Sequence, residues 1–248
     1  MPLRPYASMA HSKAFTLPSD AFCAATHGEV RDMTPYHKKV AAMTAIDIHT
    51  HNSTVAPDAI FNSGCSYIAG RSISIGIHPW HINDNWKSEL ANIAEWAKAA
   101  NVVAIGECGF DMLKSPADIL LQEEIFLSHA QLSEALCKPL IIHCVKAFDR
   151  LVSLHKGQRP RQAWIIHGFR GKPQQAAQLI NAGFYISLGE RFNPDSAKAI
   201  PTDRLFIESD ESPLPIADIY ASVAEAKEIP AEQLALQIMA NARIFRQF

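Results

Sequence analysis

The chain has 248 residues, of which 48% are hydrophobic and 19% are charged, a balance that suits one large globular domain and excludes a disordered protein. Its formal net charge of −2 excludes a general electrostatic attraction for nucleic acid, so a phosphate-bearing substrate would need a local site. No apolar run approaches the roughly 20 residues that span a bilayer, and polar residues and prolines interrupt the amino-terminal segment. We expect neither membrane association nor a secretory signal.

The cysteines favour a reducing compartment. There are five of them, an odd number, and no two form a C-x-x-C pair. Reduced thiols in a cytoplasmic protein are the simplest interpretation. The cysteines are Cys23, Cys65, Cys108, Cys137 and Cys144.

Residues 1–42 show neither helical nor strand periodicity, and prolines are scattered among polar and small residues. We expect a poorly ordered extension there, followed by a single folded domain over residues 43–248. Met43 stands just before the first predicted strand, which suggests that translation naturally begins there or at Met33. An intact mass of the endogenous protein that includes Met1 would contradict this hypothesis.

From residue 43 onward, short β-rich runs alternate with helical patterns, which is typical of βαβ units and a parallel sheet. Seven clear strands and a doubtful one near 59–62 predict a (β/α)8 barrel, a fold of about 250 residues. A full crossover helix does not fit within 52–73, so we expect the barrel to be irregular around its first two strands. The predicted strands are 44–49, 73–78, 102–107, 139–144, 163–168, 184–189 and 205–210, and the helices are 89–99, 120–136, 173–182, 219–227 and 231–245.

Two histidines follow the first predicted strand. His49 and His51 are separated by one residue, and side chains at i and i+2 of a strand point to the same side. They can approach one ion together if the strand runs to the open end of a barrel. In a chain with 11 histidines this spacing also arises by chance, so the metal hypothesis depends on further ligands downstream.

Such ligands stand at the carboxyl end of nearly every predicted strand, which is the active-site face of a parallel barrel. Any single one is explained by a structural histidine or a helix-capping carboxylate, but the ordered set indicates a metal site. In chain order the set is His49, His51, His78, Glu107, His143, His167, Glu208 and Asp210.

Four neutral imidazoles and two carboxylates exceed what one catalytic ion takes from protein while it keeps a position for water, so we predict two divalent ions. A carboxylate has two oxygens and can bridge two ions, and Glu107 falls midway in the series. Such a pair supports hydrolysis, because it generates hydroxide at neutral pH and stabilises attacking and leaving oxygens. We assign His49, His51 and Asp210 to one ion, His143 and His167 to the other, and Glu107 between them.

Three residues are predicted substrate contacts. His78 is left over once both ions are filled, and a structural hydrogen bond is its alternative role. Arg170 and Lys146 follow strands that end in ligands and could bind phosphate, although both could also be ordinary solvated charges. Trp80 and Phe169 could stack on a base, with core packing as the default for both. We assign Asp47 and Glu208 supporting or structural roles around the ligands rather than direct catalysis.

With these motifs in hand, the sequence resembles the TatD family of metal-dependent hydrolases, which are amidohydrolase-like TIM barrels. The resemblance covers about residue 44 to the end, and the order and spacing of its pieces are highly specific. They are DIHTH at 47–51, GIHP at 76–79, AIGECGFD at 104–111, PLIIHC at 139–144, IHGFRG at 166–171, GFYISLG at 183–189, LFIESD at 205–210 and NARIF at 241–245.

The resemblance implies a two-metal hydrolase of phosphodiesters, typically a deoxyribonuclease acting on DNA, with the ligands on the residues assigned above. It implies that Asp210 orients or deprotonates the attacking water, beside the bridging Glu107. Family members use zinc, manganese or magnesium, and the imidazole-rich ligand set favours zinc or manganese over magnesium.

This chain departs from the family pattern near the substrate. Val145 stands where the family usually has Arg, Lys146 where an acid is common, and Ser209 where Thr is usual. The final loop, 211–217, is short and lacks the family's Arg-Asn-x-Pro element. Two alternatives therefore stay open: a two-metal hydrolase of a small phosphoester or amide, and a metal-bound subunit that is active only with a protein partner.

Overall fold

The computed structural model describes residues 45–55 and 59–245. The predicted extension over residues 1–42, the two candidate start methionines and Cys23 lie outside these residues. Within the described residues, the other four cysteines are free thiols. Among the same residues, no helix has the length and apolar character needed to cross a membrane.

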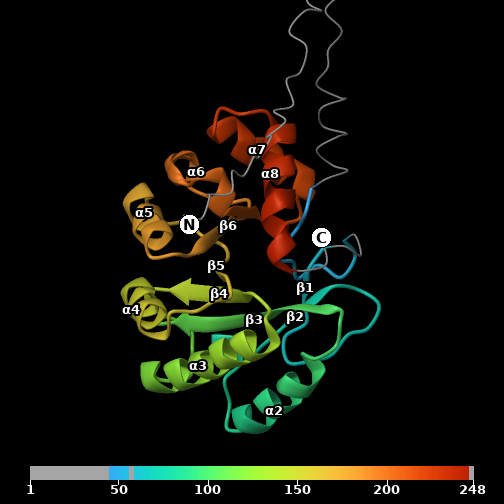
Figure 1. Ribbon diagram of the computed structural model, residues 1–248, viewed down its shortest axis with the longest axis vertical. Helices are drawn as coiled ribbons and strands as arrows, with labels where there is room; N and C mark the ends of the chain where they lie inside the picture. The colour runs from blue at the N-terminus through green and yellow to red at the C-terminus, as the bar shows by residue number, and fades with distance from the viewer. Residues whose placement is uncertain (1–44, 56–58, 246–248) are drawn as a thin grey trace, which may run out of the picture. The chain divides into compact units, whose positions relative to one another are not determined.

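Seven parallel strands form one sheet whose order in space follows the order along the chain (Figure 1). Each strand therefore pairs with the next, as expected when right-handed crossovers build a barrel one unit at a time. The strands are β1 (Phe61–Asn62), β2 (Ile73–Ile75), β3 (Val102–Asp111), β4 (Leu140–Val145), β5 (Trp164–Ile166), β6 (Tyr185–Leu188) and β7 (Leu205–Ile207).

The segment that precedes β1 closes the sheet into a barrel. Thr50 forms parallel bridges with Phe61 of β1 on one side and with Asp210, just beyond β7, on the other. Backbone hydrogen bonds reinforce both edges: Thr50 N–H donates to the Ile60 carbonyl at 3.1 Å, and His51 N–H donates to the Asp210 carbonyl at 3.0 Å. The predicted eight-membered (β/α)8 barrel is thereby confirmed.

The prediction of a regular first strand over 44–49 is wrong. The described residues 45–51 form a bend and the isolated bridge at Thr50 rather than a regular strand, because their backbone bonds alternate between β7 and the residues before β1. The doubtful strand near 59–62 exists, shortened to β1. As expected for 52–73, its described residues contain no helix, and Arg71 packs its guanidinium 4.6 Å from the centre of the Phe61 ring.

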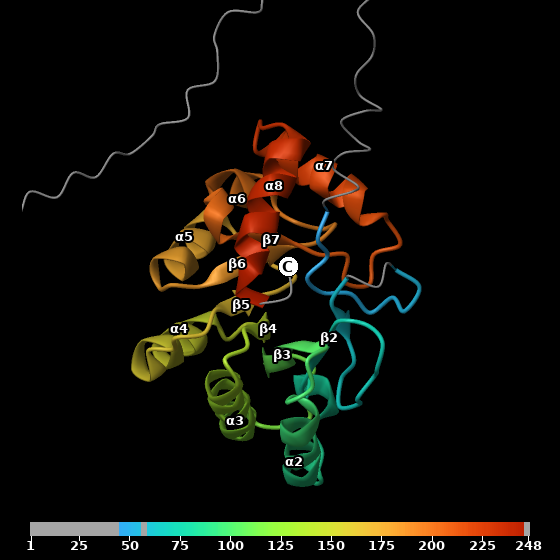
Figure 2. The same ribbon diagram turned by 45° about the vertical axis from the view of Figure 1, so that its right-hand side comes forward.

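Helices cover the outside of the strands, as Figure 2 shows, except between α7 and α2, where blue and cyan loops run. The five predicted helices all form. Two helices were missed: α4 buries only two apolar residues, and α6 has six residues, so neither gives a clear helical period. The helices are α2 (Trp86–Trp96), α3 (Ile119–Leu136), α4 (Phe148–Gln158), α5 (Pro173–Asn181), α6 (Pro194–Ala199), α7 (Ile216–Ala226) and α8 (Ala231–Asn241), with short 3-10 turns at Pro79–His81, Thr202–Arg204 and Ala242–Phe245.

The longest strand, β3, is buried along its whole length and is the centre of the fold. Behind it, Phe126 of α3 packs its ring against Phe110 of β3 and Trp164 of β5, with centroids 5.1 and 5.0 Å apart. Aromatic rings in such edge-to-face or tilted contacts stabilise a core beyond their buried area. The strand extends four residues beyond its predicted end at Glu107, so Glu107 lies inside the barrel wall rather than at its rim.

Candidate metal centre

A β-bulge turns Glu107 into the barrel. The register between β3 and β4 shifts between Ile105 and Cys108, the two residues that enclose Gly106 and Glu107. Gly106 has φ +125°, and a Cβ there would lie 2.3 Å from the Ile141 carbonyl oxygen. Only glycine allows this close approach of the two backbones, and bulges of this kind re-aim the neighbouring side chain. The glycine is therefore part of how the sequence places Glu107.

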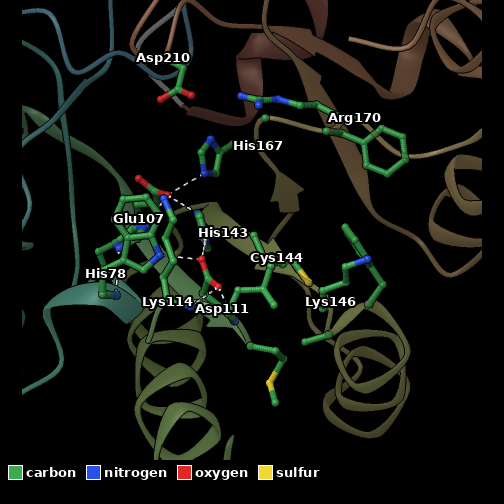
Figure 3. Close-up of a pocket in the computed structure, with 18 of the residues that line it drawn as sticks. His78, Glu107, Asp111, Lys114, His143, Cys144, Lys146, His167, Arg170 and Asp210 are labelled. Carbon is green, nitrogen blue, oxygen red and sulfur yellow. Dashed lines mark hydrogen bonds and ion pairs between the residues drawn. The ribbon is translucent and has the colours of Figure 1, made fainter. Parts of the chain in front are cut away.

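The two oxygens of Glu107 divide the imidazoles into two sets. Its Oε1 lies 2.7 Å from His167 Nε2, 2.9 Å from His143 Nδ1 and 3.0 Å from His78 Nε2. Its Oε2 lies 3.3 Å from His49 Nε2 and 3.5 Å from His51 Nε2. Figure 3 shows this carboxylate among His78, His143 and His167. One carboxylate thus faces both halves of the predicted ligand set.

Asp210 lies across the site from Glu107 (Figure 3). Its Oδ1 is 3.9 Å from His49 Nε2 and 3.7 Å from His51 Nε2, and its side chain is 24% exposed. Asp210 has φ +53°, a left-handed conformation at the point where the chain leaves the barrel wall. The carboxylate can therefore approach both the histidine pair and solvent.

The imidazoles keep Glu107 ionised in the interior. Burial raises the pKa of this carboxyl, but the His167 charge and the close ring nitrogens of His143, His167 and His49 outweigh burial and hold the pKa well below its usual range. Burial lowers the pKa of His167, yet the carboxylates of Glu107 and Glu208 raise it well above normal. The cluster therefore contains positively and negatively charged side chains in close contact.

The residues present fit divalent ions. His49 is fully buried, and neither of its ring nitrogens has a hydrogen-bond partner among the described residues, although Nε2 faces two carboxylates. Such an orphaned imidazole nitrogen is satisfied by a metal ion. Ligand atoms lie within 4.8 Å of one another in three groups: His49, His51 and Glu107; His78, Glu107 and His143; and His49, His167 and Asp210. The cluster can hold metal.

His78 is predicted to contact substrate, but its ring lies within this cluster. Its Nε2 faces Glu107, its ring meets the His143 ring with centroids 4.5 Å apart, and it belongs to one of the three groups. Its Nδ1 accepts the Trp80 N–H at 3.1 Å, which begins the 3-10 turn Pro79–His81. His78 is thus placed where it can also act as a ligand, and substrate contact stays a prediction.

Asp47 and Glu208 lie behind the ligands. Asp47 accepts hydrogen bonds from Ser209 Oγ at 2.6 Å and from the backbone N–H of Ser209 and His49, at 3.0 and 3.3 Å. Glu208 Oε1 accepts the Gly168 N–H at 2.6 Å and lies 3.3 Å from His167 Nδ1. Both carboxylates fix the backbone or ring of a histidine, as the supporting role predicts.

Sequence reasoning missed two residues of the site. Asn62, at the end of β1, donates from Nδ2 to Glu107 Oε2 at 2.9 Å. Asp111, at the end of β3, has its Oδ2 3.0 Å from His143 Nε2 and 2.6 Å from Trp80 Nε1. Both are polar residues at strand ends, the signal that identified the other members, but Asn62 follows the doubtful strand and Asp111 lies beyond the predicted end of β3.

A cavity of about 1220 Å³ opens in front of the cluster. Lys146 and Arg170, the two predicted phosphate contacts, line it (Figure 3). Trp80 also lines it and is 39% exposed, whereas Phe169 is 2% exposed and packs against the Phe148 ring. Of the two stacking candidates, Trp80 is accessible to a base and Phe169 has the core-packing role. Other cations on its walls are Lys114, Arg150 and Arg191.

The model of the family "TatD related DNase" matches residues 36–246 of this chain. The chain belongs to the TatD-related DNase family. A metal-dependent hydrolase of Buchnera aphidicola is 30% identical over 190 residues, or 68% of this chain and 71% of that protein. YabD of Bacillus subtilis, also described as a metal-dependent hydrolase, is 32% identical over 197 residues, 70% of this chain and 76% of that protein.

Another relative in the TatD family, from Klebsiella pneumoniae, is named a 3′-5′ ssDNA/RNA exonuclease and is 29% identical over 176 residues, 67% of this chain and 66% of that protein. Among solved structures, the TatD homologue YJJV of Escherichia coli superposes with a TM-score of 0.69 at 19% identity, covering 82% of this chain and 98% of that one. That likeness supports the fold. Family membership and the metal-holding cluster together identify a metal-dependent hydrolase.

Proposed function

We propose that this TatD-family chain hydrolyses phosphodiester bonds of nucleic acid, with DNA as its substrate, through two divalent ions. The observation that carries the proposal is the division of the imidazoles between the two oxygens of the buried Glu107. A carboxylate whose two oxygens face separate sets of imidazoles can contact two ions, and such a pair stabilises the attacking and leaving oxygens of a hydrolysis. The names of several relatives support the choice of nucleic acid.

The first ion would be held by His49, His51 and Asp210, and the second by His143 and His167. Glu107 would contact both, with Oε2 toward the first set and Oε1 toward the second. His78 lies beside the second set, as a further ligand or a contact to substrate. The imidazole-rich set favours zinc or manganese over magnesium. When bound, such ions lower the pKa of water and stabilise negative charge on phosphoryl oxygens.

Residues of this chain would supply the remaining chemistry. Asp210 is partly exposed and faces the cavity, so it can accept the proton of an attacking water or orient that water. Glu107 stays ionised because the surrounding imidazoles lower its pKa, so it remains a ligand rather than an acid. Asn62 orients Glu107 by donating to Oε2.

Substrate would bind in the cavity in front of the cluster. Arg170 can bind a phosphate with two parallel N–H groups, and Lys146 can act as a point charge. These cations give a local attraction to a polyanion that the net charge of −2 does not give. Cleavage of nucleic acid also agrees with the cytoplasmic location that the thiols suggest.

The test is cleavage of end-labelled single-stranded and duplex DNA by the full chain loaded with Zn²⁺, Mn²⁺ or Mg²⁺, beside a panel of small phosphoesters and amides. We expect metal-dependent cleavage of DNA. Glu107→Ala and His143→Ala should each reduce it by at least about a hundredfold, because each removes a ligand that the proposed chemistry requires. Circular dichroism spectra and melting temperatures check that both variants fold.

Unchanged activity in both variants would contradict the assigned site. If the protein hydrolyses a small ester or amide but does not cleave DNA, the proposed substrate is wrong and the proposed metal centre still holds. Inactivity of the metal-loaded chain alone, together with a stoichiometric co-purifying protein, would favour a subunit that needs a partner. Analysis of products labelled at the 5′ or 3′ end determines whether cleavage starts from an end.

A further inference from the structure

Asp111 is a buried carboxylate that meets hydrogen-bond donors on all sides. Its Oδ1 accepts the backbone N–H of Leu113 at 2.8 Å and that of Lys114 at 2.9 Å. Its Oδ2 lies 2.6 Å from Trp80 Nε1 and 3.0 Å from His143 Nε2. Figure 3 shows Asp111 directly beneath His143. Backbone N–H and indole N–H groups can only donate, so three of these four neighbours require a pure acceptor.

The backbone of Asp111 is fixed as firmly as its side chain. Its N–H donates to Gln122 Oε1 at 2.8 Å, and Gln122 is buried in α3 and also donates to the Ala117 carbonyl at 2.9 Å. The end of β3 is thus fastened to α3. Asp111 cannot rotate away from His143 without the loss of several buried hydrogen bonds, each of which is expensive to leave unmade.

This geometry has a consequence for His143. A neutral imidazole carries one proton, and the nitrogen that donates it is chosen by the partner of that nitrogen. Both ring nitrogens of His143 face a carboxylate, Nδ1 that of Glu107 and Nε2 that of Asp111. Glu107 Oε1 also faces ring nitrogens of His167 and His78, whereas Asp111 Oδ2 has only Trp80 Nε1 as a further donor among the described residues, so Asp111 is the carboxylate that needs the His143 proton. Nδ1, which faces Glu107 at 2.9 Å, is then left with its lone pair toward the proposed second ion.

His167 shows the opposite arrangement in the same cluster. Its Nδ1 faces Glu208 Oε1 at 3.3 Å, and its Nε2 faces Glu107 Oε1 at 2.7 Å. One ring is therefore held by a carboxylate at Nε2 and the other by a carboxylate at Nδ1. Both rings turn their remaining nitrogen toward the same oxygen of Glu107, so both can approach an ion that this oxygen also contacts.

We propose that Asp111 is a positioning residue that selects the Nε2-protonated tautomer of His143 and thereby presents Nδ1 as a metal ligand. The proposal rests on the ligand role of His143 in the proposed function. Carboxylate partners of metal-bound histidines fix both ring orientation and tautomer, and their loss typically weakens metal binding tenfold to a hundredfold.

Asp111→Asn is the variant that tests the proposal most directly, because neither orientation of the asparagine gives its NH₂ group an acceptor. Turned one way, the NH₂ meets two backbone N–H groups; turned the other way, it meets Trp80 and His143. Glu208→Gln is the matched control. Glu208 Oε2 is buried without a hydrogen-bond donor among the described residues, so a glutamine can place its NH₂ there and keep its oxygen on His167.

The measurement is nitrogen-15 NMR of the histidine rings in the full chain, with signals of His143 identified by their loss in His143→Gln. In the metal-free protein at pH 9 we expect the Nε2–H tautomer for His143, and in the zinc-loaded protein a metal-bound Nδ1. In the zinc-loaded protein His167 should show the reverse pattern, with the proton on Nδ1 and zinc on Nε2. A Nδ1–H tautomer of His143, or zinc bound through its Nε2, would overturn the proposal. These signals do not depend on which substrate is cleaved.

Calorimetric titration with Zn²⁺ supplies the second readout. Asp111→Asn should weaken one of two binding events by at least tenfold, whereas Glu208→Gln should weaken binding less. Trp80→Phe removes one donor from Asp111 Oδ2 but leaves His143 in place, so the His143 tautomer should persist. Equal zinc affinity in Asp111→Asn and wild type would contradict the proposal. If Asp111→Asn fails to fold, the tautomers in wild type and Trp80→Phe still decide it.

Discussion

The two regions that supply the proposed metal ligands are built in different ways. The entry region, from Ile46 to Ile75, has two strands of two and three residues and only single bridges at Thr50. The central region pairs the ten-residue β3 with the six-residue β4 along a buried ladder. One region carries His49 and His51, and the other carries Glu107 and His143.

Side chains replace the missing ladder in the entry region. Asp47 accepts two hydrogen bonds from Ser209 and a third from the His49 N–H, and Tyr220 of α7 bonds both backbone groups of Ile46. The central region relies instead on close backbone approach at Gly106 and Gly109. A short, irregular strand can therefore place ligands as well as a long one, provided that buried polar side chains fix its backbone.

The largest expected effect on stability comes from a substitution in the central region. Gly109 has φ +142°, and a Cβ there would lie 2.0 Å from the His143 carbonyl oxygen. Gly109→Ala should therefore separate β3 from β4 and reduce the free energy of unfolding by more than about 4 kcal/mol, measured by urea denaturation. Gly157→Ala is the control: this exposed helical glycine has nothing within 4 Å of the added Cβ, and the change should stabilise by about 0.5 kcal/mol. Equal effects would contradict the close backbone approach of β3 and β4 at Gly109.

A pH-dependent effect tests the contact between α3 and the segment that follows β2. His129 of α3 is fully buried, accepts the Ile77 N–H at Nε2 and donates from Nδ1 to the Ile125 carbonyl. Burial lowers the pKa of His129 from 6.5 to about 4. As pH falls below 6.5 the unfolded chain takes up the proton first, so the contribution of His129 is complete above pH 6.5 and is lost toward pH 4.

The size of that loss is about 3 kcal/mol, because each unit of pKa difference corresponds to about 1.4 kcal/mol. Free energies of unfolding should be measured from pH 7 to pH 4 for wild type and for His129→Gln, whose side chain does not titrate. The advantage of wild type should shrink by about 3 kcal/mol across this range. Parallel curves for the two proteins would show that His129 does not titrate on unfolding.

The smallest expected effect concerns the entry region. Tyr220→Phe removes the hydroxyl that accepts the Ile46 N–H at 3.1 Å and donates to the Ile46 carbonyl at 2.8 Å. The variant should lose about 2 kcal/mol of stability, because buried backbone groups become unsatisfied. Tyr67→Phe is the matched control: its hydroxyl bonds Asn101 at the surface, so its loss should cost less than about 1 kcal/mol. A similar cost in both variants would mean that Ile46 is satisfied without Tyr220.

The sequence by itself determined the fold class and the residues that gather at the site. The order of strands along the chain requires that polar residues at their carboxyl ends meet at one face, so His49, Glu107, His167 and Asp210 come together whatever the loops do. The connection within 52–73 is too short for a full crossover helix, so the sequence also predicted that the first two strands are joined without one.

Only the tertiary structure decided how those residues face one another. The closure of the barrel at Thr50, the bulge that aims Glu107, and the contacts of Asn62 and Asp111 depend on the register between neighbouring strands. Local spacing does not encode that register, because a shift of one residue turns a side chain to the opposite face of the sheet. Which nitrogen of His143 and of His167 faces Glu107 follows from the same packing, and it decides which nitrogen each ring can offer to the proposed ions.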